Sequence, residues 1–486
     1  MSEIRVRFPP SPTGRLHLGN ARTALFNYLF ARHSKGKFIF RIEDTDSARS
    51  KEEYVNDEIE ALKWLGIEWD EGPDIGGSFG PYRQSMRFSI YKEYVDKLLS
   101  GENAYHCFCS PEEIEEDRKS SIQRGEAPKY SGRCRNLSKE EVKRRISNGE
   151  SYSIRFRLPE DSGSVAINDL IRGIINFPLK GLDDFIIIRS DGIPTYNFAV
   201  VIDDALMQIT HILRGEDHLF GNTPRQILIY KALGLKPPYF AHFPMILGTD
   251  RTKLSKRHGA FAITDYKDLG FLPEALVNYM ALLGWSPKTE RELFTLSELI
   301  ELFDLSGIGV SPAIFDYEKL KWFNSYYIRQ KTGKELFLYV KDEILKGGFL
   351  EKDSLAQEKI EDVLEFSKEH FTLTTDIVPY LKMIYLFSGA DAEHLKLLNK
   401  EEAIKLFNLF IDKLKNLKEW NSQNILNLIR EIGKELGIKG KNLYFPFRIA
   451  ITGIEEGPEI YLVIYLLGKE RVISILESVL TKLYEG

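Results

Sequence analysis

The chain has few cysteines and no long hydrophobic run. Only three of its 486 residues are cysteines, and this odd, small number argues against a disulfide framework and for a reducing compartment such as the cytosol. No uninterrupted apolar run approaches the roughly 18 residues that a membrane span needs. The start, MSEIRVRFPP, places arginines where a signal peptide has its apolar segment. We therefore expect a cytoplasmic protein.

The chain also lacks a basic surplus. It contains 66 Lys and Arg residues and 71 Asp and Glu residues, which gives a formal net charge of -5. Because nucleic-acid-binding domains usually carry a basic surplus on the docking face, RNA binding would require an uneven placement of these cations. At a length of 486 residues we expect roughly three to five structural units. Repeats, low-complexity tracts and long linkers are absent, so we expect these units to pack against one another.

The N-terminal segment has the pattern of a βαβ unit. Residues 4–8 (IRVRF) form a short β-rich run, and PPSPTG supplies residues that break regular structure. The segment NARTALFNYLFAR then has helical spacing of its apolar residues, and KFIFRIED returns to a strand pattern that ends at Glu43. This pattern predicts a parallel, doubly wound sheet.

Later segments complete a multidomain α/β organisation. Further strand-like runs, DFIIIRS, FAVVID and ITHILR, follow only after residue 183, so the stretch from about 100 to 190 is predicted to be inserted into the sheet domain. Beyond residue 265, amphipathic helical patterns such as NILNLIREIGKELG dominate. The fold class predicted is therefore a Rossmann-like parallel sheet with an α+β insertion, followed by an all-α region.

Charged residues at the predicted strand ends indicate a ligand. In an open parallel sheet the ligand binds beyond the carboxyl ends of the strands, where this sequence has Arg7, Glu43 and Arg214. Two cations and one anion complement a ligand with one cation and two anions, which describes free glutamate or aspartate. Each residue alone is more readily explained as a surface ion-pair residue, but their combination at three strands favours a site.

Two loops have the composition of a nucleotide site. The first, PPSPTGRLHLGN, has no G-x-G-x-x-G fingerprint but places His17 and Gly19 at a helix N-terminus, where backbone N–H groups attract phosphate. The second is the lysine-rich KLSKR at residues 253–257. By itself a run such as KLSKR is more often a solvated surface segment.

Together these segments resemble a known family. HLGN resembles the HIGH motif of class I aminoacyl-tRNA synthetases, and KLSKR resembles their KMSKS motif. The wider segments are similar to bacterial glutamyl-tRNA synthetases: VRFPPSPTGRLHLGNARTALFNYLFAR, FRIEDTD, DEGPDIGGSFGPYRQS, GIPTYNFAVVIDD and ITHILRGEDHLFGNTPRQ. The resemblance is most specific in the first 330 residues.

The resemblance implies an activity and a set of site residues. The activity is ATP-dependent activation of L-glutamate and its transfer to the 3'-terminal adenosine of tRNA(Glu), with Mg2+ bound mainly by the phosphates. His17 and Lys256 are the implied catalytic residues. The implied nucleotide contacts are Thr13, Gly14, His17, Gly19, Asn20, Asp217, Lys253, Ser255 and Lys256. The implied amino-acid contacts are Arg7, Ser11, Glu43, Tyr196 and Arg214, in which Glu43 binds the α-ammonium group and the arginines bind the side-chain carboxylate.

The resemblance also implies a structural zinc site in the insertion. Some family members carry one there, and Cys107, Cys109 and Cys134 match three of its ligands. Asn136 occupies a place where some relatives have a histidine ligand, so Tyr130 is predicted as the fourth ligand. The alternative is a group of buried free thiols.

The resemblance predicts the domain limits and the partners. The catalytic domain is predicted at 1–100 and 191–250, the acceptor-stem-binding insertion at 101–190, the stem-contact domain with the KLSKR loop at 251–330, and two helical anticodon-binding domains at 331–390 and 391–486. A monomer is implied. Discriminating relatives use an arginine near the segment SKEHFTLTTD, where His370 is the nearest basic residue here, so tRNA(Gln) stays open as a second acceptor.

Three alternatives compete with this interpretation. Glutaminyl-tRNA synthetase shares the catalytic fold, but its anticodon region is a β-barrel. A shorter paralogue that glutamylates a modified tRNA base lacks an anticodon domain, whereas this chain is long enough for one. A catalytically inactive tRNA-binding relative is expected to lose His17 or the lysine-rich loop, and this chain keeps both.

Overall fold

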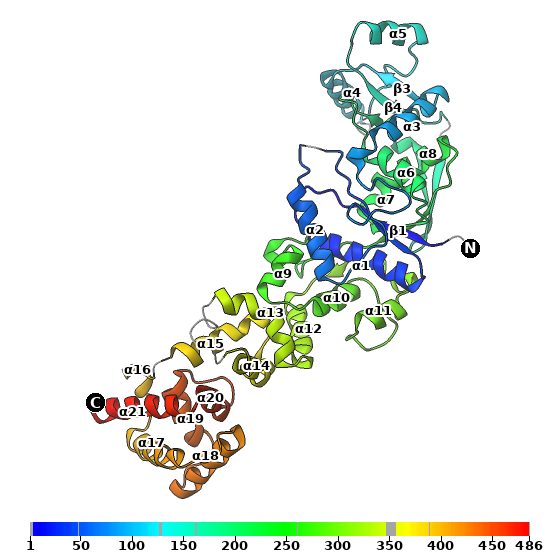
Figure 1. Ribbon diagram of the computed structural model, residues 1–486. Coiled ribbons are helices and arrows are strands. Elements are labelled where there is room, and N and C mark those ends of the chain that lie inside the picture. The colour runs from blue at the N-terminus through cyan, green and yellow to red at the C-terminus, as the bar shows by residue number, and fades with distance from the viewer. Residues whose placement is uncertain are drawn as a thin grey trace. The chain divides into compact units, whose positions relative to one another are not determined.

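The computed structural model describes residues 3–46, 48–125, 129–160, 163–259, 261–346, 356–387 and 389–485. The chain forms two compact units (Figure 1). The first contains Met1–Asp265 and Leu276–Tyr317, and the second contains Tyr266–Ala275 and Glu318–Gly486. Among the described residues, no helix has both the length and the apolar character that a membrane crossing requires.

The predicted βαβ unit opens the first unit. Strand β1 (Arg5–Phe8) pairs in parallel with β2 (Lys37–Phe40), and helix α1 (Leu18–His33) connects them. All four residues of β1 are buried, as expected for a strand that is covered on both faces. The unit places the loop at residues 9–17 directly after the carboxyl end of β1.

A second group of strands extends the sheet. β8 (His211–Gly215) and β9 (Tyr239–Phe243) pair in parallel, with Arg214 opposite His242. β5 (Ser164–Asp169) pairs in parallel with β9 and antiparallel with β6 (Gly173–Pro178). The backbone N–H of Thr210 donates to the carbonyl of Arg5 at 2.9 Å, so β8 lies beside β1. The carboxyl ends of β1, β8 and β9 therefore face one edge.

The insertion has its own antiparallel sheet. β3 (Ala104–Cys107), β4 (Ser153–Phe156) and β7 (Ile186–Ile188) form it, with helices α4 (Pro111–Gln123) and α5 (Lys139–Ser147) between β3 and β4. Both helices begin with a capping serine: Ser110 accepts from the backbone N–H of Glu113, and Ser138 accepts from that of Glu141. The run DFIIIRS thus forms a strand of this sheet, and β5 and β6, from the stretch predicted as inserted, join the larger sheet.

One strand prediction was wrong. The run FAVVID lies in helix α6 (Tyr196–Leu206), in which every residue from Phe198 to Asp204 is buried. A short apolar run that is buried on all sides has no period that separates a strand from a helix. The two aspartates at its end, Asp203 and Asp204, carry buried side chains.

Further elements belong to the first unit or to the chain segments that pass from one unit to the other. The helices are α2 (Glu52–Trp64), α3 (Phe88–Ser100), α7 (Asp217–Gly221), α8 (Thr223–Ala232), α9 (Ile263–Leu269), α10 (Pro273–Leu282) and α11 (Leu296–Leu302). The short strands β10 (Ile246–Leu247) and β11 (Ala313–Ile314) pair in parallel. Short 3-10 turns occur at Gln84–Met86, Leu179–Gly181, Lys256–His258 and Leu305–Gly307.

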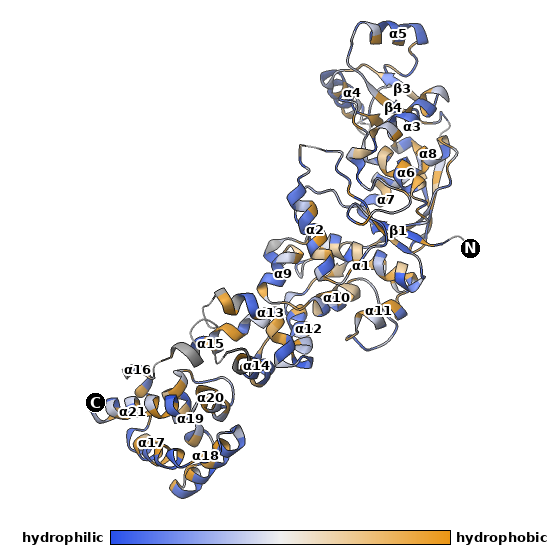
Figure 2. Ribbon diagram, in the orientation of Figure 1, coloured by the Kyte–Doolittle hydropathy of each residue, from blue (hydrophilic) through white to orange (hydrophobic). Residues whose placement is uncertain are grey.

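The second unit is helical in its described part. Its helices are α12 (Tyr317–Gln330), α13 (Gly333–Lys346), α14 (Ala356–Ser367), α15 (Ile377–Leu386), α16 (Ala392–Leu395), α17 (Lys400–Lys415), α18 (Ser422–Leu436), α19 (Lys441–Thr452), α20 (Ile460–Leu467) and α21 (Lys469–Glu485), with 3-10 turns at Lys368–His370 and Thr374–Asp376. These helices have apolar and polar sides (Figure 2).

Helix α18 illustrates why the helical half folds as it does. Ile425, Leu428, Ile429 and Ile432 recur at helical spacing and are buried. Asn421 caps the first turn by accepting from the backbone N–H of Asn424, and Gly437 ends the helix in a left-handed conformation.

The predicted fold class is confirmed: a parallel-sheet catalytic region with an α+β insertion is followed by helices. Among the described residues after Ile314 there is no strand, which counts against the β-barrel of the glutaminyl alternative. The five predicted domain limits stay a prediction.

Candidate active site

A cavity of about 780 Å³ lies beyond the carboxyl ends of β1, β8 and β9. Most residues predicted for the site line this cavity: Arg7, Ser11, Thr13, His17, Gly19, Asn20, Glu43, Tyr196, Arg214, Asp217, Lys253 and Ser255. Gly14 is not among the lining residues, and the side chain of Lys256 lies outside what the structure describes. The strand ends and the two loops thus meet at one cavity.

Arg7 and Glu43 are held in a buried ionic network. The Nε atom of Arg7 lies 3.3 Å from both carboxylate oxygens of Asp204. Arg41 donates to Asp204 at 2.8 Å and to Glu43 at 3.0 Å. All four side chains are buried, so this network fixes two of the predicted contacts from behind.

The buried environment of Glu43 changes the pKa of its carboxyl group. Burial raises the pKa of Glu43 to about 7, although the nearby Arg41 and Arg7 act to lower it. A carboxylate that is only partly ionised near neutral pH gains its full charge when a cation approaches. Glu43 is therefore suited to bind an ammonium group.

Arg214 has a different environment, because all its hydrogen-bond partners are neutral. Its nitrogens donate to His242 Nε2 at 3.2 Å, Thr223 Oγ1 at 2.8 Å, Gln226 Oε1 at 2.9 Å and Tyr196 Oη at 3.4 Å. Within the described part of the chain, Arg214 forms no ion pair with a carboxylate, and burial lowers its pKa. A buried guanidinium group without a counter-ion attracts an anionic ligand.

The other end of the cavity is formed by the start of α1. His17 precedes the first helical residue in an extended conformation and makes no capping hydrogen bond with its side chain. Ser11, Thr13, His17 and Asn20 are exposed to solvent. Backbone N–H groups at the start of a helix, together with the helix dipole, suit an anion such as a phosphate.

The KLSKR loop joins this end. The backbone N–H of Ile263 donates to the carbonyl of Leu16 at 2.8 Å, which ties the segment after the loop to the HLGN segment. Beside the loop, His258 Nδ1 lies 3.1 Å from both the backbone N and the Oγ of Ser255, and His258 Nε2 lies 3.1 Å from Asp250 Oδ2. Lys253 and Ser255 are exposed.

Sequence reasoning missed several residues that shape the cavity. Asp204, Thr223, Gln226 and His242 hold the two arginines, and His218 lines the cavity. Burial, followed by the charge of Arg214, lowers the pKa of His218 to about 4, so its ring is neutral at pH 7. The signal that could have found Asp204 is a pair of aspartates ending the apolar run FAVVI.

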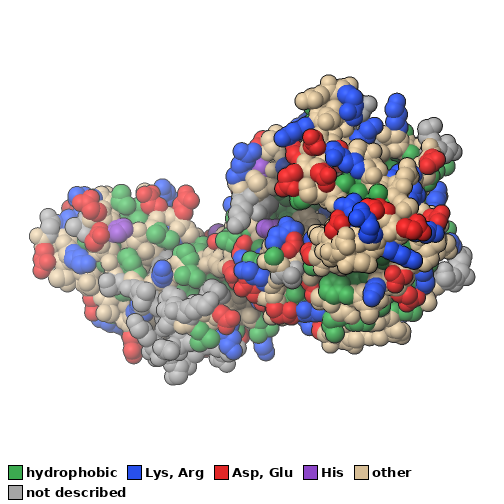
Figure 3. Space-filling view, turned by 90° about the horizontal axis from the view of Figure 1, so that it is seen from above, with side chains coloured by type: hydrophobic (Ala, Val, Ile, Leu, Met, Phe, Trp, Pro, Cys, Tyr) green, Lys and Arg blue, Asp and Glu red, His purple; other side chains and the backbone are tan. Residues whose placement is uncertain are grey.

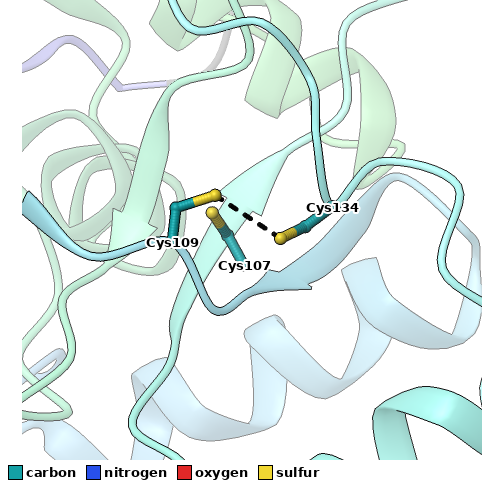
Figure 4. A group of neighbouring side chains, drawn as sticks. All are labelled: Cys107, Cys109 and Cys134. Carbon is teal, nitrogen blue, oxygen red and sulfur yellow. Dashed lines mark hydrogen bonds between the residues drawn. The ribbon is translucent and has the colours of Figure 1, made fainter. Parts of the chain in front are cut away.

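A second cluster lies in the insertion. Cys107, Cys109 and Cys134 bring their sulfur atoms within 4.8 Å of one another (Figure 4). The hydroxyl oxygen of Tyr130 lies 3.4 Å from Cys107 Sγ and 3.7 Å from Cys109 Sγ. The Sγ atoms of Cys109 and Cys134 are 3.6 Å apart. Hydrogen bonds from Cys134, Tyr130 and Arg155 lower the pKa of Cys107 despite its burial. The structure therefore groups the four residues predicted as zinc ligands.

The face of the molecule shown in Figure 3 has no broad basic patch among its described residues. In Figure 3, acidic and basic side chains are intermixed among the described residues of the visible face. RNA contacts on that face would thus depend on local groups of cations.

Comparisons with known proteins agree with this geometry. Residues 3–322 match the family model described as "tRNA synthetases class I (E and Q), catalytic domain", and residues 333–480 match an anticodon binding domain. The chain is 49% identical to a glutamate–tRNA ligase of Carboxydothermus hydrogenoformans, over 96% of this chain and 97% of that one. It is 48% identical to that of Aquifex aeolicus, over 99% and 100%.

A solved structure extends the likeness to the fold. The crystal structure of a glutamate tRNA ligase from Elizabethkingia meningosepticum, in complex with its amino acid, superposes with a TM-score of 0.90 at 34% identity and covers 99% of this chain and 100% of that one. From its family match and its full-length relatives, the chain belongs to the class I tRNA synthetases of the E and Q family.

Proposed function

We propose that the chain is a glutamate–tRNA ligase that activates L-glutamate with ATP and transfers it to the 3'-terminal adenosine of tRNA(Glu). The observation that carries this proposal is Arg214, a buried guanidinium group whose hydrogen-bond partners among the described residues are all neutral. It lies in the same cavity as Glu43 and the HLGN and KLSKR segments. The full-length relatives bear the same name.

The amino acid binds at the arginine end. Glu43 receives the α-ammonium group, and Arg214, with Arg7, receives the side-chain carboxylate; Ser11 and Tyr196 complete the contacts. Glutamine would place a neutral amide against Arg214 and leave the buried cation without a counter-ion, so the site rejects it.

ATP binds at the loop end. The start of α1 and the residues Thr13, His17, Gly19 and Asn20 contact the nucleotide, together with Asp217, Lys253, Ser255 and Lys256. Mg2+ enters with the phosphates as part of the substrate. His17 and Lys256 are the residues we assign to stabilising the charge that develops on the phosphates.

The reaction needs no nucleophile from the protein. An oxygen of the glutamate α-carboxylate attacks the α-phosphorus of ATP, and the bond to the leaving pyrophosphate breaks. A ribose hydroxyl of the terminal adenosine then attacks the acyl carbon, loses its proton, and releases AMP. The protein contributes position and fixed charge, which together account for large rate enhancements in such transfers.

The cysteine cluster fits a structural zinc ion. Two thiolates bound to the same zinc at about 2.3 Å lie roughly 3.8 Å apart in a tetrahedral site, and the Cys109–Cys134 separation of 3.6 Å is close to that value. Cys107, Cys109, Cys134 and Tyr130 would hold the ion and so cross-link β3 to the loop before α5. Metal analysis of the purified protein, with Cys134→Ser as the variant, tests this assignment: one zinc per chain is expected, and its absence from the unmodified protein would contradict it.

The helical unit serves tRNA recognition. The match to an anticodon binding domain at 333–480 supports this role, and unpaired bases are the usual targets of sequence-specific RNA recognition. His370 lies in the short 3-10 turn Lys368–His370, and we leave tRNA(Gln) as a second possible acceptor. A cytoplasmic monomer completes the proposal.

Aminoacylation with radiolabelled glutamate tests the function. Purified protein, ATP and Mg2+ are incubated with tRNA(Glu), tRNA(Gln) or neither, with Lys256→Ala as the inactive control. Label on tRNA(Glu) alone indicates a discriminating enzyme, and label on both indicates relaxed anticodon recognition. Absence of label with tRNA still bound would overturn the enzymatic proposal and favour the inactive tRNA-binding alternative.

A further inference from the structure

A buried chain of hydrogen bonds lies behind Arg214. His242 stands opposite Arg214 on the neighbouring strand β9 and is fully buried. Its Nε2 atom lies 3.2 Å from Arg214 Nε, and its Nδ1 atom lies 2.7 Å from Asp169 Oδ2. Asp169 ends β5 and is also buried. Three parallel strands thus contribute one residue each to a line that ends at the cavity.

The hydrogen bonds of Asp169 determine which nitrogen of the His242 imidazole carries the proton. Its Oδ1 accepts the backbone N–H groups of Ile171 and Arg172, each at 2.9 Å, and its Oδ2 accepts the backbone N–H of His242 at 3.1 Å. Burial favours protonation of Asp169, but these bonds and that from the imidazole outweigh it and lower its pKa. An ionised carboxylate only accepts, so the imidazole proton must be on Nδ1.

The other imidazole nitrogen is then an acceptor. Guanidinium nitrogens only donate, so the contact at 3.2 Å is a hydrogen bond from Arg214 Nε to a neutral Nε2. Thr223 and Gln226 accept from Nη2 of the same arginine. Burial lowers the pKa of His242, which agrees with a neutral ring. The guanidinium plane is therefore held at two edges by groups that carry no charge.

We infer that Asp169 and His242 form a positioning pair that orients Arg214 without neutralising it and so determines the selectivity for a carboxylate over an amide. This inference rests on the proposed function. A carboxylate in the place of His242 would supply Arg214 with a counter-ion. Arg214 would then no longer favour an anionic ligand over a neutral one. Asp169 supplies the counter-charge one residue further away, where it fixes the tautomer of His242.

A purely structural role predicts a different outcome. His242 and Asp169 also cross-link neighbouring strands, and loss of such a cross-link lowers stability and the fraction of folded enzyme. A smaller folded fraction lowers the apparent kcat but leaves the KM for glutamate unchanged. The KM for glutamate and the preference for glutamate over glutamine are therefore the readouts that separate positioning from stability.

Three variants test the contributions of His242 and Asp169 separately. His242→Asn keeps an amide donor near Asp169 but is too short to accept from Arg214, whereas His242→Gln places an amide oxygen near the former Nε2. Asp169→Asn retains the histidine but cannot accept all four donors. His211→Asn is the matched control, because His211 lies at the far end of the same strand as Arg214 and contacts Thr210 at 2.8 Å.

Initial rates of tRNA(Glu) charging are measured against glutamate and against ATP, with glutamine as competitor. We expect His242→Asn and Asp169→Asn to raise the KM for glutamate about tenfold or more, the usual cost of a lost hydrogen bond to a charged group, and to weaken glutamine rejection. His242→Gln recovers part of both, and the KM for ATP stays constant.

Two results have different meanings. If the unmodified protein fails to charge tRNA(Glu), the proposed function itself is wrong. If it charges tRNA(Glu) but both His242→Asn and Asp169→Asn keep its KM for glutamate and its glutamine rejection, the positioning role is overturned even where the variants melt at lower temperature.

Discussion

The two ends of the cavity are built in opposite ways. At the end that we propose for the amino acid, Arg7, Glu43 and Arg214 are buried and held by residues of neighbouring strands and helices. At the end that we propose for the nucleotide, His17, Lys253 and Ser255 are exposed, and the side chains in and beside the KLSKR loop contact mainly one another. Fixed, desolvated charges distinguish one amino acid from a close analogue, whereas a nucleotide brings enough charge to be held by exposed groups and backbone N–H donors.

The strongest test of this contrast is removal of the cation at the buried end. We expect Arg214→Ala to lower kcat/KM for glutamate by about a thousandfold, since loss of one partner of a buried charged contact costs about 4 kcal/mol. Arg32→Ala is the control, because Arg32 forms a partly exposed ion pair with Asp70 at 2.8 Å at the end of α1. A loss below tenfold would place the counter-ion of the glutamate side chain elsewhere.

The next effect concerns stability at the same end. Asp204→Asn leaves Arg7 and Arg41 buried without this carboxylate, and we expect the free energy of unfolding to fall by about 3 kcal/mol. Urea unfolding followed by tryptophan fluorescence measures it. In the control Glu93→Gln, loss of the exposed ion pair with Lys97 should change it by less than about 1 kcal/mol. Equal changes in both variants would remove the distinction between buried and surface pairs.

The pH dependence should differ between the two ends. Burial raises the pKa of Glu43 to about 7, and its carboxyl group must be ionised to bind an ammonium group. The fraction of protein with an ionised Glu43 therefore increases as pH rises. We expect kcat/KM for glutamate to increase about eightfold from pH 5.5 to 6.5 and to level off above about pH 8. The KM for ATP should not follow the same curve, and a shared curve would point to a group that serves both substrates.

The same contrast explains what could be predicted from the sequence. Strand ends and loop motifs are local, so Arg7, Glu43, Arg214, His17 and the KLSKR loop could be identified as lining candidates. The partners that hold the arginines come from other segments. Asp204 directly follows the run FAVVID, which has a strand-like pattern but forms a helix, and nothing local marks His242 or Gln226 as neighbours of Arg214. Register between parallel strands, as in Arg214 opposite His242, is a tertiary property that a single sequence does not display.

The smallest expected effect lies at the exposed end, in the contacts of His258. Its imidazole connects Ser255 to Asp250, and hydrogen bonds donated by Thr252 and then by His258 lower the pKa of Asp250. Because contacts with exposed partners such as Asp250 and Ser255 contribute about 0.5 to 1 kcal/mol each, we expect His258→Ala to raise the KM for ATP roughly threefold to tenfold. The KM for glutamate and the urea midpoint should stay unchanged, as they should in the control Arg251→Ala. A hundredfold rise would mean that the loop is held as firmly as Arg214, and the two ends would then differ in exposure but not in preorganisation.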